Sequence, residues 1–141
     1  MKRNKQILKE IKNLVMEYKA LNEKTDIPAF KKSIGLTIKS AKIQGNARKP
    51  LSTYSDEEIL TILFDNNKTL QLQAAPESTV GDETYIYPDK DVKKMKGKTI
   101  QDIKNLDYDT EVVITMTDGS SFTFKCDSES AEGAIFNYYF K

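Results

Sequence analysis

Residues 111–124 read EVVITMTDGSSFTF, and this stretch decides the expected fold. Apolar and polar side chains alternate on both sides of Asp118-Gly119, and an Asp-Gly pair between two alternating runs is the strongest short-range signal for a β-hairpin. Glycine accepts the positive φ that such a tight turn requires. We therefore predict two antiparallel strands, at residues 112–117 and 121–124, joined by a turn at Asp118-Gly119.

A weaker copy of the same pattern lies earlier in the chain. Residues 97–100 (GKTI) echo residues 35–38 (GLTI), and residues 111–124 echo residues 58–72, with a turn that is one residue shorter in the second copy. Strands are accordingly expected at residues 36–43, 58–64, 69–75 and 84–87. The sequence therefore predicts two related β-hairpin units, of which the first carries a longer loop containing Arg48.

The segment from Lys5 to Glu23 has the periodicity of a helix. Apolar residues spaced by four and three positions form one face, namely Ile7, Ile11, Leu14, Tyr18 and Leu21. A helix of this length is marginal in water, so its apolar face must be buried against something. We expect it to dock on the sheet of its own chain, with pairing to an identical helix as the second candidate. A short helix is predicted at residues 28–33, because Pro28 suits a first helical turn and Gly35 ends it.

These elements predict an α+β fold in which an N-terminal amphipathic helix packs on an antiparallel sheet built from two related β-hairpin units. The 141 residues, 38% of them apolar, suffice for one core. We expect one compact domain with a basic helical segment at 1–34, a first β unit with an inserted loop at 35–88, and a second β unit with an aromatic C-terminus at 89–141.

The run from Ala134 to Phe140 is too aromatic to remain in water. We expect it to add an edge strand or to pack across the sheet, and an oligomer contact is the alternative. The candidate interface residues for a homodimer or higher oligomer are Ile7, Ile11, Leu14, Tyr18, Phe136 and Tyr138.

Composition bounds the location of the protein. No run approaches the roughly 18 apolar residues of a spanning helix, and charged residues interrupt the early apolar positions, which argues against a secretory signal. A single cysteine, Cys126, cannot form an internal disulfide and fits a reducing compartment. We therefore expect a cytoplasmic protein without a membrane partner.

Charge is distributed unevenly along the chain. Residues 1–49 hold 13 Lys and Arg against 4 Asp and Glu, whereas residues 50–141 hold 9 against 17. Such polarity is typical of a basic arm that binds nucleic acid, or of a basic helix that docks on an acidic sheet. Lysines on a solvated helix face are the simpler interpretation.

The sequence lacks the residues of common catalytic and metal sites. It contains no histidine, which removes the commonest general base and metal ligand, and Cys126 has no base to activate it. No glycine-rich phosphate loop occurs. Asp107 to Glu111 begin like a calcium loop, but Val112 and Asp118 occupy the sixth and twelfth positions, so these acids are expected to form a turn. We predict a protein that is not an enzyme and has no cofactor.

Binding residues are therefore sought among the cations and aromatics. Arginine suits bidentate contact with carboxylate or phosphate, and Arg48 lies in the inserted loop. Its expected companions, if the loops after the first and third strands meet, are Lys49, Tyr54, Tyr85 and Tyr87. The alternative is that Arg48 is an ordinary solvated loop residue.

On the GKTI opening and the EVVITMTDGSSFTF hairpin, residues 96–126 resemble short bacteriophage and mobile-element proteins of unassigned function, and residues 35–72 share the likeness more weakly. The resemblance implies a phage or plasmid setting, in which small chains without enzymatic residues are often inhibitors of host defence. Our leading hypothesis is thus a stoichiometric inhibitor or adaptor that binds a partner protein. The alternative is a binder of an anionic ligand, either nucleic acid through the basic helix or a small nucleotide through Arg48 and the tyrosines.

Overall fold

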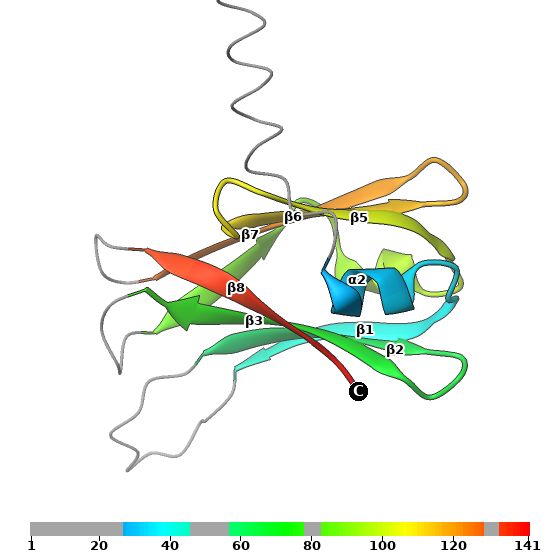
Figure 1. Ribbon diagram of the computed structural model, residues 1–141, viewed down its shortest axis with the longest axis horizontal. Coiled ribbons are helices and arrows are strands. Elements are labelled where there is room, and N and C mark those ends of the chain that lie inside the picture. Colours follow the sequence, from blue (N-terminus) through cyan, green and yellow to red (C-terminus); the bar gives the residue numbers. More distant parts are fainter. Residues whose placement is uncertain (1–26, 46–56, 78–82, 129–132) are drawn as a thin grey trace, which may run out of the picture.

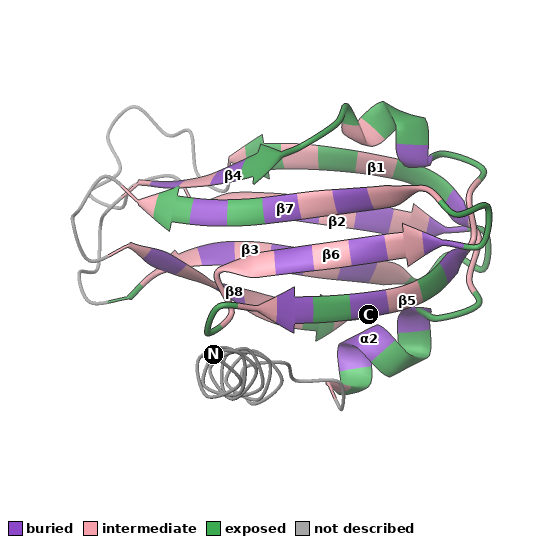
Figure 2. Ribbon diagram, turned by 90° about the horizontal axis from the view of Figure 1, so that it is seen from above, coloured by how far each residue is buried: buried purple, intermediate pink, exposed green. Residues whose placement is uncertain are grey.

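The computed structural model describes residues 27–45, 57–77, 83–128 and 133–141, which form two four-stranded antiparallel sheets that face each other (Figures 1 and 2). The strand order is β1-β2-β3-β8 in the first sheet and β4-β7-β6-β5 in the second. The strands are β1 Ile38–Gly45, β2 Glu58–Phe64, β3 Thr69–Pro76, β4 Thr84–Pro88, β5 Ile100–Leu106, β6 Glu111–Met116, β7 Ser121–Ser128 and β8 Ala134–Phe140. The helical elements are α2 Pro28–Ser33 and the 3-10 turn η1 Val92–Met95.

Alternating side chains place the core between the sheets. On β2 the residues Leu60, Ile62 and Phe64 are buried while their neighbours are half-buried, and β6 repeats the pattern (Figure 2). Successive side chains of a strand point to opposite faces, so this alternation gives each sheet one apolar face. Each such side chain contributes about 1.5–3 kcal/mol when it is fully buried. The packing of the two apolar faces therefore holds the sheets together.

The hairpin predicted around Asp118-Gly119 is confirmed, since β6 pairs antiparallel with β7. Gly119 has a φ of 89°, and in the β2–β3 hairpin Asn67 takes the equivalent place with a φ of 67°. The expectation of a shorter second turn is wrong. Phe64 donates its N–H to Lys68 at 2.9 Å, just as Met116 donates to Ser120 at 2.8 Å, so the two turns have the same length.

The two halves of the chain are related by an approximate two-fold axis. Gly35 N–H donates to Ile100 O and Gly97 N–H donates to Ile38 O, both at 2.8 Å. Thr37 and Thr99, the threonines of the two G-x-T-I motifs, form a bridge and their Oγ1 atoms lie 2.8 Å apart. The repeated motif is therefore the place where the two units contact each other.

Each unit contributes its last strand to the other unit's sheet. β4 pairs with β7, and β8, which is drawn red in Figure 1, pairs with β3 along its whole length. Of the two arrangements predicted for residues 134–140, an edge strand or packing across the sheet, the structure shows the edge strand. Both sheets therefore contain strands from both halves of the chain.

The predicted α+β class is wrong for the described residues, which are almost entirely antiparallel β-structure in two sheets rather than one. Their only α-helix is α2, at the predicted residues 28–33, because Pro28 stands in its first turn and Gly35 follows it with a φ of 86°. α2 packs against β8 and β5, whereas η1 packs against β1. The predicted helix at residues 5–23 lies outside the described residues.

Candidate functional site

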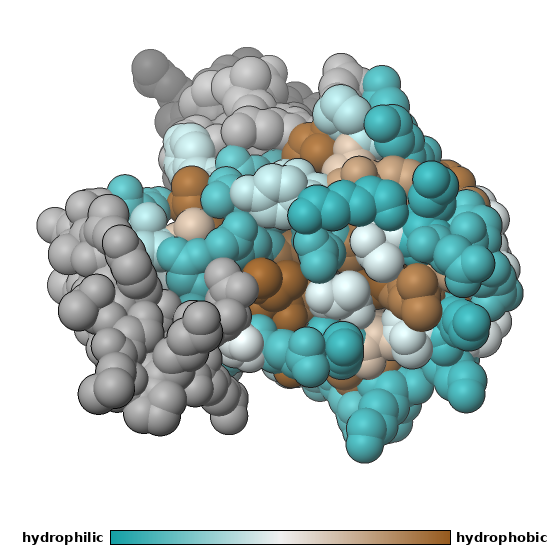
Figure 3. Space-filling model, turned by 90° about the horizontal axis from the view of Figure 1, so that it is seen from below, coloured by the Kyte–Doolittle hydropathy of each residue, from teal (hydrophilic) through white to brown (hydrophobic). Residues whose placement is uncertain are grey.

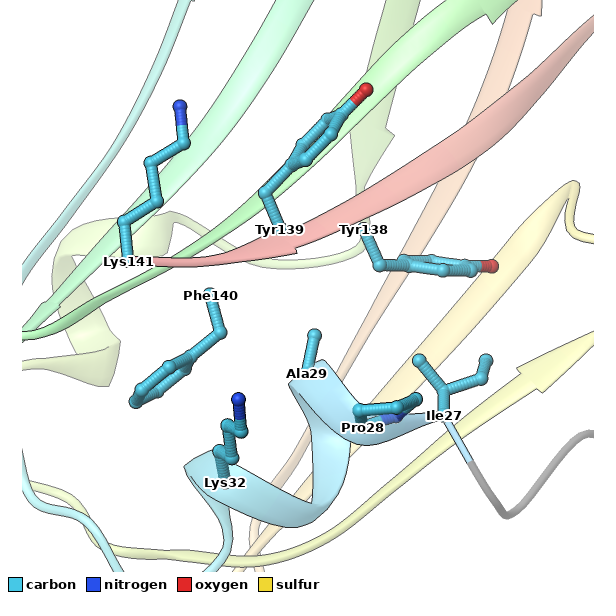
Figure 4. Close-up of a pocket in the computed structure, with 8 residues that line it drawn as sticks. All are labelled: Ile27, Pro28, Ala29, Lys32, Tyr138, Tyr139, Phe140 and Lys141. Atoms are coloured by element: carbon cyan, nitrogen blue, oxygen red, sulfur yellow. The ribbon is translucent and has the colours of Figure 1, made fainter.

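A pocket of about 340 Å³ opens between α2 and the C-terminal half of β8 (Figure 4). Its wall on the helix side comes from the start of α2, and the opposite wall comes from consecutive residues of β8. The lining residues are Ile27, Pro28, Ala29, Lys32, Tyr138, Tyr139, Phe140 and Lys141. This volume is at the lower end of the range of small-molecule pockets, so the space fits one or two side chains of a partner.

Strand geometry explains how four consecutive residues line one pocket. Tyr138 and Phe140 point toward α2, whereas Tyr139 and Lys141 point to the other side of the strand (Figure 4). The Tyr138 ring packs edge-on against Phe30 of the helix, with ring centroids 4.6 Å apart. The pocket therefore surrounds the outer edge of β8 and includes side chains from both faces of the sheet.

Two lysines stand at the mouth of the pocket. The Nζ atom of Lys32 lies 6.0 Å from the centroid of the Phe140 ring, and that of Lys141 lies 5.7 Å from the Tyr139 ring. The electron-rich faces of these rings attract the ammonium groups. Among the described residues, no acidic side chain lines the pocket. The site thus combines apolar walls with positive charge and suits an apolar group that carries a nearby carboxylate.

A partly buried polar cluster of Asn105, Asp109 and Tyr138 connects the β5–β6 turn to β8. The Asp109 carboxylate accepts hydrogen bonds from the Tyr138 hydroxyl, at 3.0 Å, and from the side-chain amide of Asn105, which is 0% exposed. The carbonyl oxygen of Asp109 accepts the backbone N–H of Phe136 at 2.7 Å. These bonds join the β5–β6 turn to β8 and fix the position of Tyr138 in the pocket wall.

The turn that carries Asp109 has an unusual backbone. Asp107, Tyr108 and Asp109 have φ values of 50°, 53° and 67°. Non-glycine residues with positive φ are uncommon and occur in the left-handed region at an energetic cost. The hydrogen bonds of Asp109 with Asn105 and Tyr138 oppose this cost. The turn predicted from the sequence at Asp107–Glu111 is present at residues 107–110, and Glu111 begins β6.

Burial perturbs two weak acids beside this turn. Burial raises the pKa of the Tyr138 hydroxyl, and the negative charge of Asp109 adds to the effect. Burial also raises the pKa of the Cys126 thiol to about 12. Cys126 is free, and its Sγ lies 3.4 Å from the carbonyl oxygen of Ala134. Both groups are neutral at physiological pH, and the thiol is a poor nucleophile there.

The part of the first sheet's outer face that is formed by β2, β3 and β8, next to the pocket, carries no charged side chain within these strands. Outward-pointing residues of β2, β3 and β8 are Ile59, Thr61, Leu63, Thr69, Gln71, Gln73, Ala75, Ile135, Asn137 and Tyr139. Figure 3 views the molecule from this side and shows apolar patches among hydrophilic residues. Tyr139, which is 40% exposed, belongs both to this face and to the pocket.

Comparison with known protein families, curated proteins and solved structures finds no match.

Charged side chains are distributed unevenly between the two ends of the described sheets. Acidic residues gather at the end where β1, β3, β5 and β7 finish; they are Glu57, Glu58, Glu77, Glu83, Asp107, Asp109, Glu111 and Asp127. The opposite end, around η1, is rich in lysine, with Lys90, Lys93, Lys94, Lys96 and Lys98. These lysines stand among Asp89, Asp91 and Asp118, and Asp118 forms an ion pair with Lys98. In the parts of the chain that the structure describes, no three Asp, Glu, Cys or His side chains are grouped so as to hold a metal ion, and no helix is long and apolar enough to cross a membrane.

The sequence-predicted binding residues are only partly within the described chain. Arg48, Lys49 and Tyr54 lie outside it, as do the predicted interface residues Ile7, Ile11, Leu14 and Tyr18. Tyr85 and Tyr87 lie on the outward face of β4, with ring centroids 6.3 Å apart, and Tyr85 donates a hydrogen bond to Glu83. Glu58 N–H bonds Thr84 Oγ1 at 3.2 Å, so the described residues that flank the two loops do meet at one end of the sandwich.

The two C-terminal interface candidates have different environments. Phe136 is 2% exposed and belongs to the core, so it does not reach a surface partner. Tyr138 is half-buried in the pocket wall. The pocket itself was not predicted, because its walls come from segments about 110 positions apart that carry no shared motif. The density of aromatic residues in β8 was the signal that could have indicated it.

Proposed function

We propose that this chain is a non-catalytic binding protein, a stoichiometric inhibitor or adaptor that occupies the surface of a partner protein through α2, β8 and the adjoining outer face of the first sheet. The observation that carries the proposal is the aromatic, lysine-rimmed pocket of about 340 Å³ beside β8. A pocket of this size can hold one anchoring side chain of a partner protein. The uncharged outer face of β2, β3 and β8 beside it enlarges the buried contact area without a large cost of desolvating charges.

Aromatic residues support a binding role for this face. Tyrosine is enriched among residues that dominate binding energy, because it buries a large ring and has few rotamers to lose. Tyr139 presents an exposed ring, and Lys141 lies over it. Truncation of such an anchor costs about 2 kcal/mol or more of binding free energy when the ring is buried by the partner.

The chemistry of the chain supports a mechanism of occupancy. The sequence has no histidine, and the Cys126 thiol, with a pKa raised to about 12, stays protonated at neutral pH. A free, buried cysteine also supports a cytoplasmic setting for the proposed inhibitor. The likeness of the GKTI and Asp-Gly hairpin segments to mobile-element proteins suggests that the partner belongs to a bacterial host.

Comparative capture tests the proposal. The tagged wild-type chain and the variants Tyr139→Asp and Tyr87→Asp are used to capture proteins from a bacterial lysate, which are then identified by mass spectrometry. Tyr87 is 56% exposed on β4 and provides a matched control at the other sheet. We expect a protein that wild type and Tyr87→Asp retain and that Tyr139→Asp loses, in a complex of fixed stoichiometry by light scattering.

Two results contradict the proposal. A partner retained equally by Tyr139→Asp places the binding face elsewhere, and turnover of any substrate that a point change in this chain abolishes makes the protein an enzyme. Comparison of the urea midpoints of the variants excludes unfolding as the cause of lost capture.

A second candidate function is the binding of an anionic ligand, which the lysines around η1 favour. Nucleic-acid binding through several lysines weakens steeply with salt, with a log-log slope of about −0.9 per phosphate contact on duplex DNA. Fluorescence anisotropy of a labelled DNA duplex between low and high salt tests this candidate. Absence of binding at low salt removes it, and unchanged nucleotide affinity in Arg48→Ala removes the small-nucleotide version.

A further inference from the structure

The outer edge of β8 exposes backbone hydrogen-bonding groups. Thr69 and Lys141 exchange both of their backbone hydrogen bonds, at 3.2 and 3.0 Å. In an antiparallel ladder such bonded pairs alternate with non-bonded pairs, and Leu70–Phe140 and Leu72–Tyr138 are therefore non-bonded pairs. The N–H and C=O groups of Tyr138 and Phe140 consequently point away from β3, into the open side of the sheet.

Only the first part of this edge is covered within the described residues. The N–H of Phe136 donates to the carbonyl of Asp109 at 2.7 Å, so the β5–β6 turn closes the edge up to this point. No described residue forms a hydrogen bond with the backbone of Tyr138 or Phe140 on that side. These two residues also line the pocket beside α2 (Figure 4). An open strand edge and a side-chain pocket therefore coincide.

The other three sheet edges carry devices that discourage pairing with a foreign strand. β1 and β5 each contain an irregularity in register near their start, and both carry exposed lysines, Lys39 and Lys42 on β1 and Lys104 on β5. β4 is short and ends at Pro88. Bulges, lysines, prolines and short length are the usual protections of edge strands. β8 has no charged residue, no proline and a continuous register, so its only protections among the described residues are the cover of the β5–β6 turn at Phe136 and the packing of α2 beside it.

We propose that β8 is a strand-addition site, at which an extended segment of a partner protein pairs with the backbone of Tyr138 and Phe140 and inserts an apolar side chain into the pocket beside α2. The proposal rests on the binding function proposed above and names its mode. In this mode main-chain hydrogen bonds supply affinity and pockets for alternate side chains supply specificity.

The lysines at the pocket define the chemistry of the incoming segment. Lys32 and Lys141 lie on either side of the edge and have no acidic neighbour in the pocket, so the segment that fits has acidic residues alternating with aliphatic or aromatic ones. A second copy of β8 is a poorer occupant. Two-fold pairing of β8 with itself would bring the Lys32 and Lys141 ammonium groups of both copies together.

The test uses the full-length, isotope-labelled protein and a blocked synthetic peptide of ten residues in which glutamate alternates with valine and phenylalanine. We expect the amide signals of Tyr138 and Phe140 to shift on titration and their hydrogen exchange to slow. A peptide of the same sequence that is N-methylated at alternate residues, on the side that faces β8, cannot donate to the ladder and should bind at least about tenfold more weakly.

Charge reversal supplies the matched control. The double variant Lys32→Glu with Lys141→Glu should weaken the glutamate peptide by about tenfold or more and should now bind the lysine counterpart of the peptide. Lys39→Glu with Lys42→Glu makes the same change of net charge on the exposed residues of the β1 edge and should leave both affinities unchanged.

Several results would overturn strand addition. One is the absence of any shift of the β8 amide signals at millimolar peptide, and another is equal binding of the N-methylated peptide. A third is slow hydrogen exchange of the Tyr138 and Phe140 amides in the free protein, which would mean that another segment or a second copy already covers the edge. If any of these results is found and capture of a natural partner still needs Tyr139, the proposed binding function stands. Strand addition as its mode of binding is then removed. If the peptide binds at β8 but no lysate yields a partner whose capture needs Tyr139, strand addition stands and the proposed inhibitor or adaptor function is removed.

Discussion

The hydroxyl of Tyr138 on β8 donates a hydrogen bond of 3.0 Å to the carboxylate of Asp109 in the β5–β6 turn. This bond joins the pocket wall to a turn whose backbone is held in the left-handed region at three consecutive residues. The carbonyl oxygen of Asp109 also accepts a hydrogen bond from the backbone N–H of Phe136, so the β5–β6 turn covers the edge of β8 at this residue. Asp109 therefore marks the point beyond which the backbone edge of β8 is open.

Removal of the Tyr138 hydroxyl should therefore destabilise the fold. We expect Tyr138→Phe to lower the free energy of unfolding by about 1–3 kcal/mol, because the partly buried Asp109 carboxylate loses one of its hydrogen bonds. Tyr139→Phe on the neighbouring, exposed residue should change it by less than about 0.5 kcal/mol. Urea unfolding of the three proteins measures both values, and equal midpoints for the two variants would show that the bond contributes nothing.

The sequence predicted the strands well because their signal is local. Alternation with a period of two marks β2, β3, β6 and β7, the Asp-Gly pair marks one turn, and Pro28 with Gly35 marks α2. The aromatic run at residues 134–140 indicated an edge strand, which β8 is. Each of these features needs only the residues within the element itself.

The arrangement of the strands could not be predicted in the same way. β3 pairs with β8 between residues that are 58 to 70 positions apart, from Pro76 with Ala134 to Leu70 with Phe140. A strand's pattern of apolar residues does not specify which sheet it joins. The prediction of one sheet under a helix was therefore wrong, since each half donates its last strand to the other half's sheet. The pocket depends on the same exchange, because its lining residues on the side of the first sheet all come from β8 and the residue that follows it.

The length of the first turn was misread because residues 58–72 were compared with residues 111–124 from their first positions, Glu58 and Glu111. The backbone aligns them on the residues with positive φ, Asn67 and Gly119. Backbone conformation determines the turn, and the acidic side chains follow no such constraint.

Because Asn67 and Gly119 occupy equivalent positions with positive φ, we predict that substitutions at the two positions have opposite effects on stability. Asn67→Gly should stabilise the protein by up to about 1 kcal/mol by relieving a left-handed conformation, whereas Gly119→Ala should destabilise it by about 1–2 kcal/mol. A Cβ at Gly119 would meet no atom within 4 Å, so the cost comes from the backbone alone. Thermal unfolding of each variant checks the signs, and a destabilised Asn67→Gly would contradict the equivalence.

The burial of Phe136 predicts a core role rather than an interface role. Phe136→Ala should lower the free energy of unfolding by about 3–5 kcal/mol, the usual cost of a large cavity. Tyr139→Ala, three residues further on the same strand but on the outer face, should cost less than about 1 kcal/mol. Chemical denaturation of both variants measures the difference. A small effect at Phe136 would mean that the two sheets do not enclose it.

The raised pKa of Cys126 predicts a specific loss of stability in alkali. Its ordinary value is 9.0 and burial raises it to about 12 in the folded protein, so between these two values the thiol ionises in the unfolded chain while it stays neutral in the fold. The unfolded state then binds fewer protons, and the free energy of unfolding falls with rising pH by at most about 1.4 kcal/mol per pH unit. Below pH 9 the stabilisation that comes from the neutral, buried thiol is fully present.

The variant Cys126→Ala lacks the titrating group and serves as the reference. The difference in free energy of unfolding between wild type and Cys126→Ala should be constant from pH 6 to 8 and should shrink between pH 9 and 12 as wild type weakens. Tyrosines ionise in both proteins and cancel in the difference. Urea unfolding across this range is the measurement, and parallel curves up to pH 12 would place the thiol in contact with solvent.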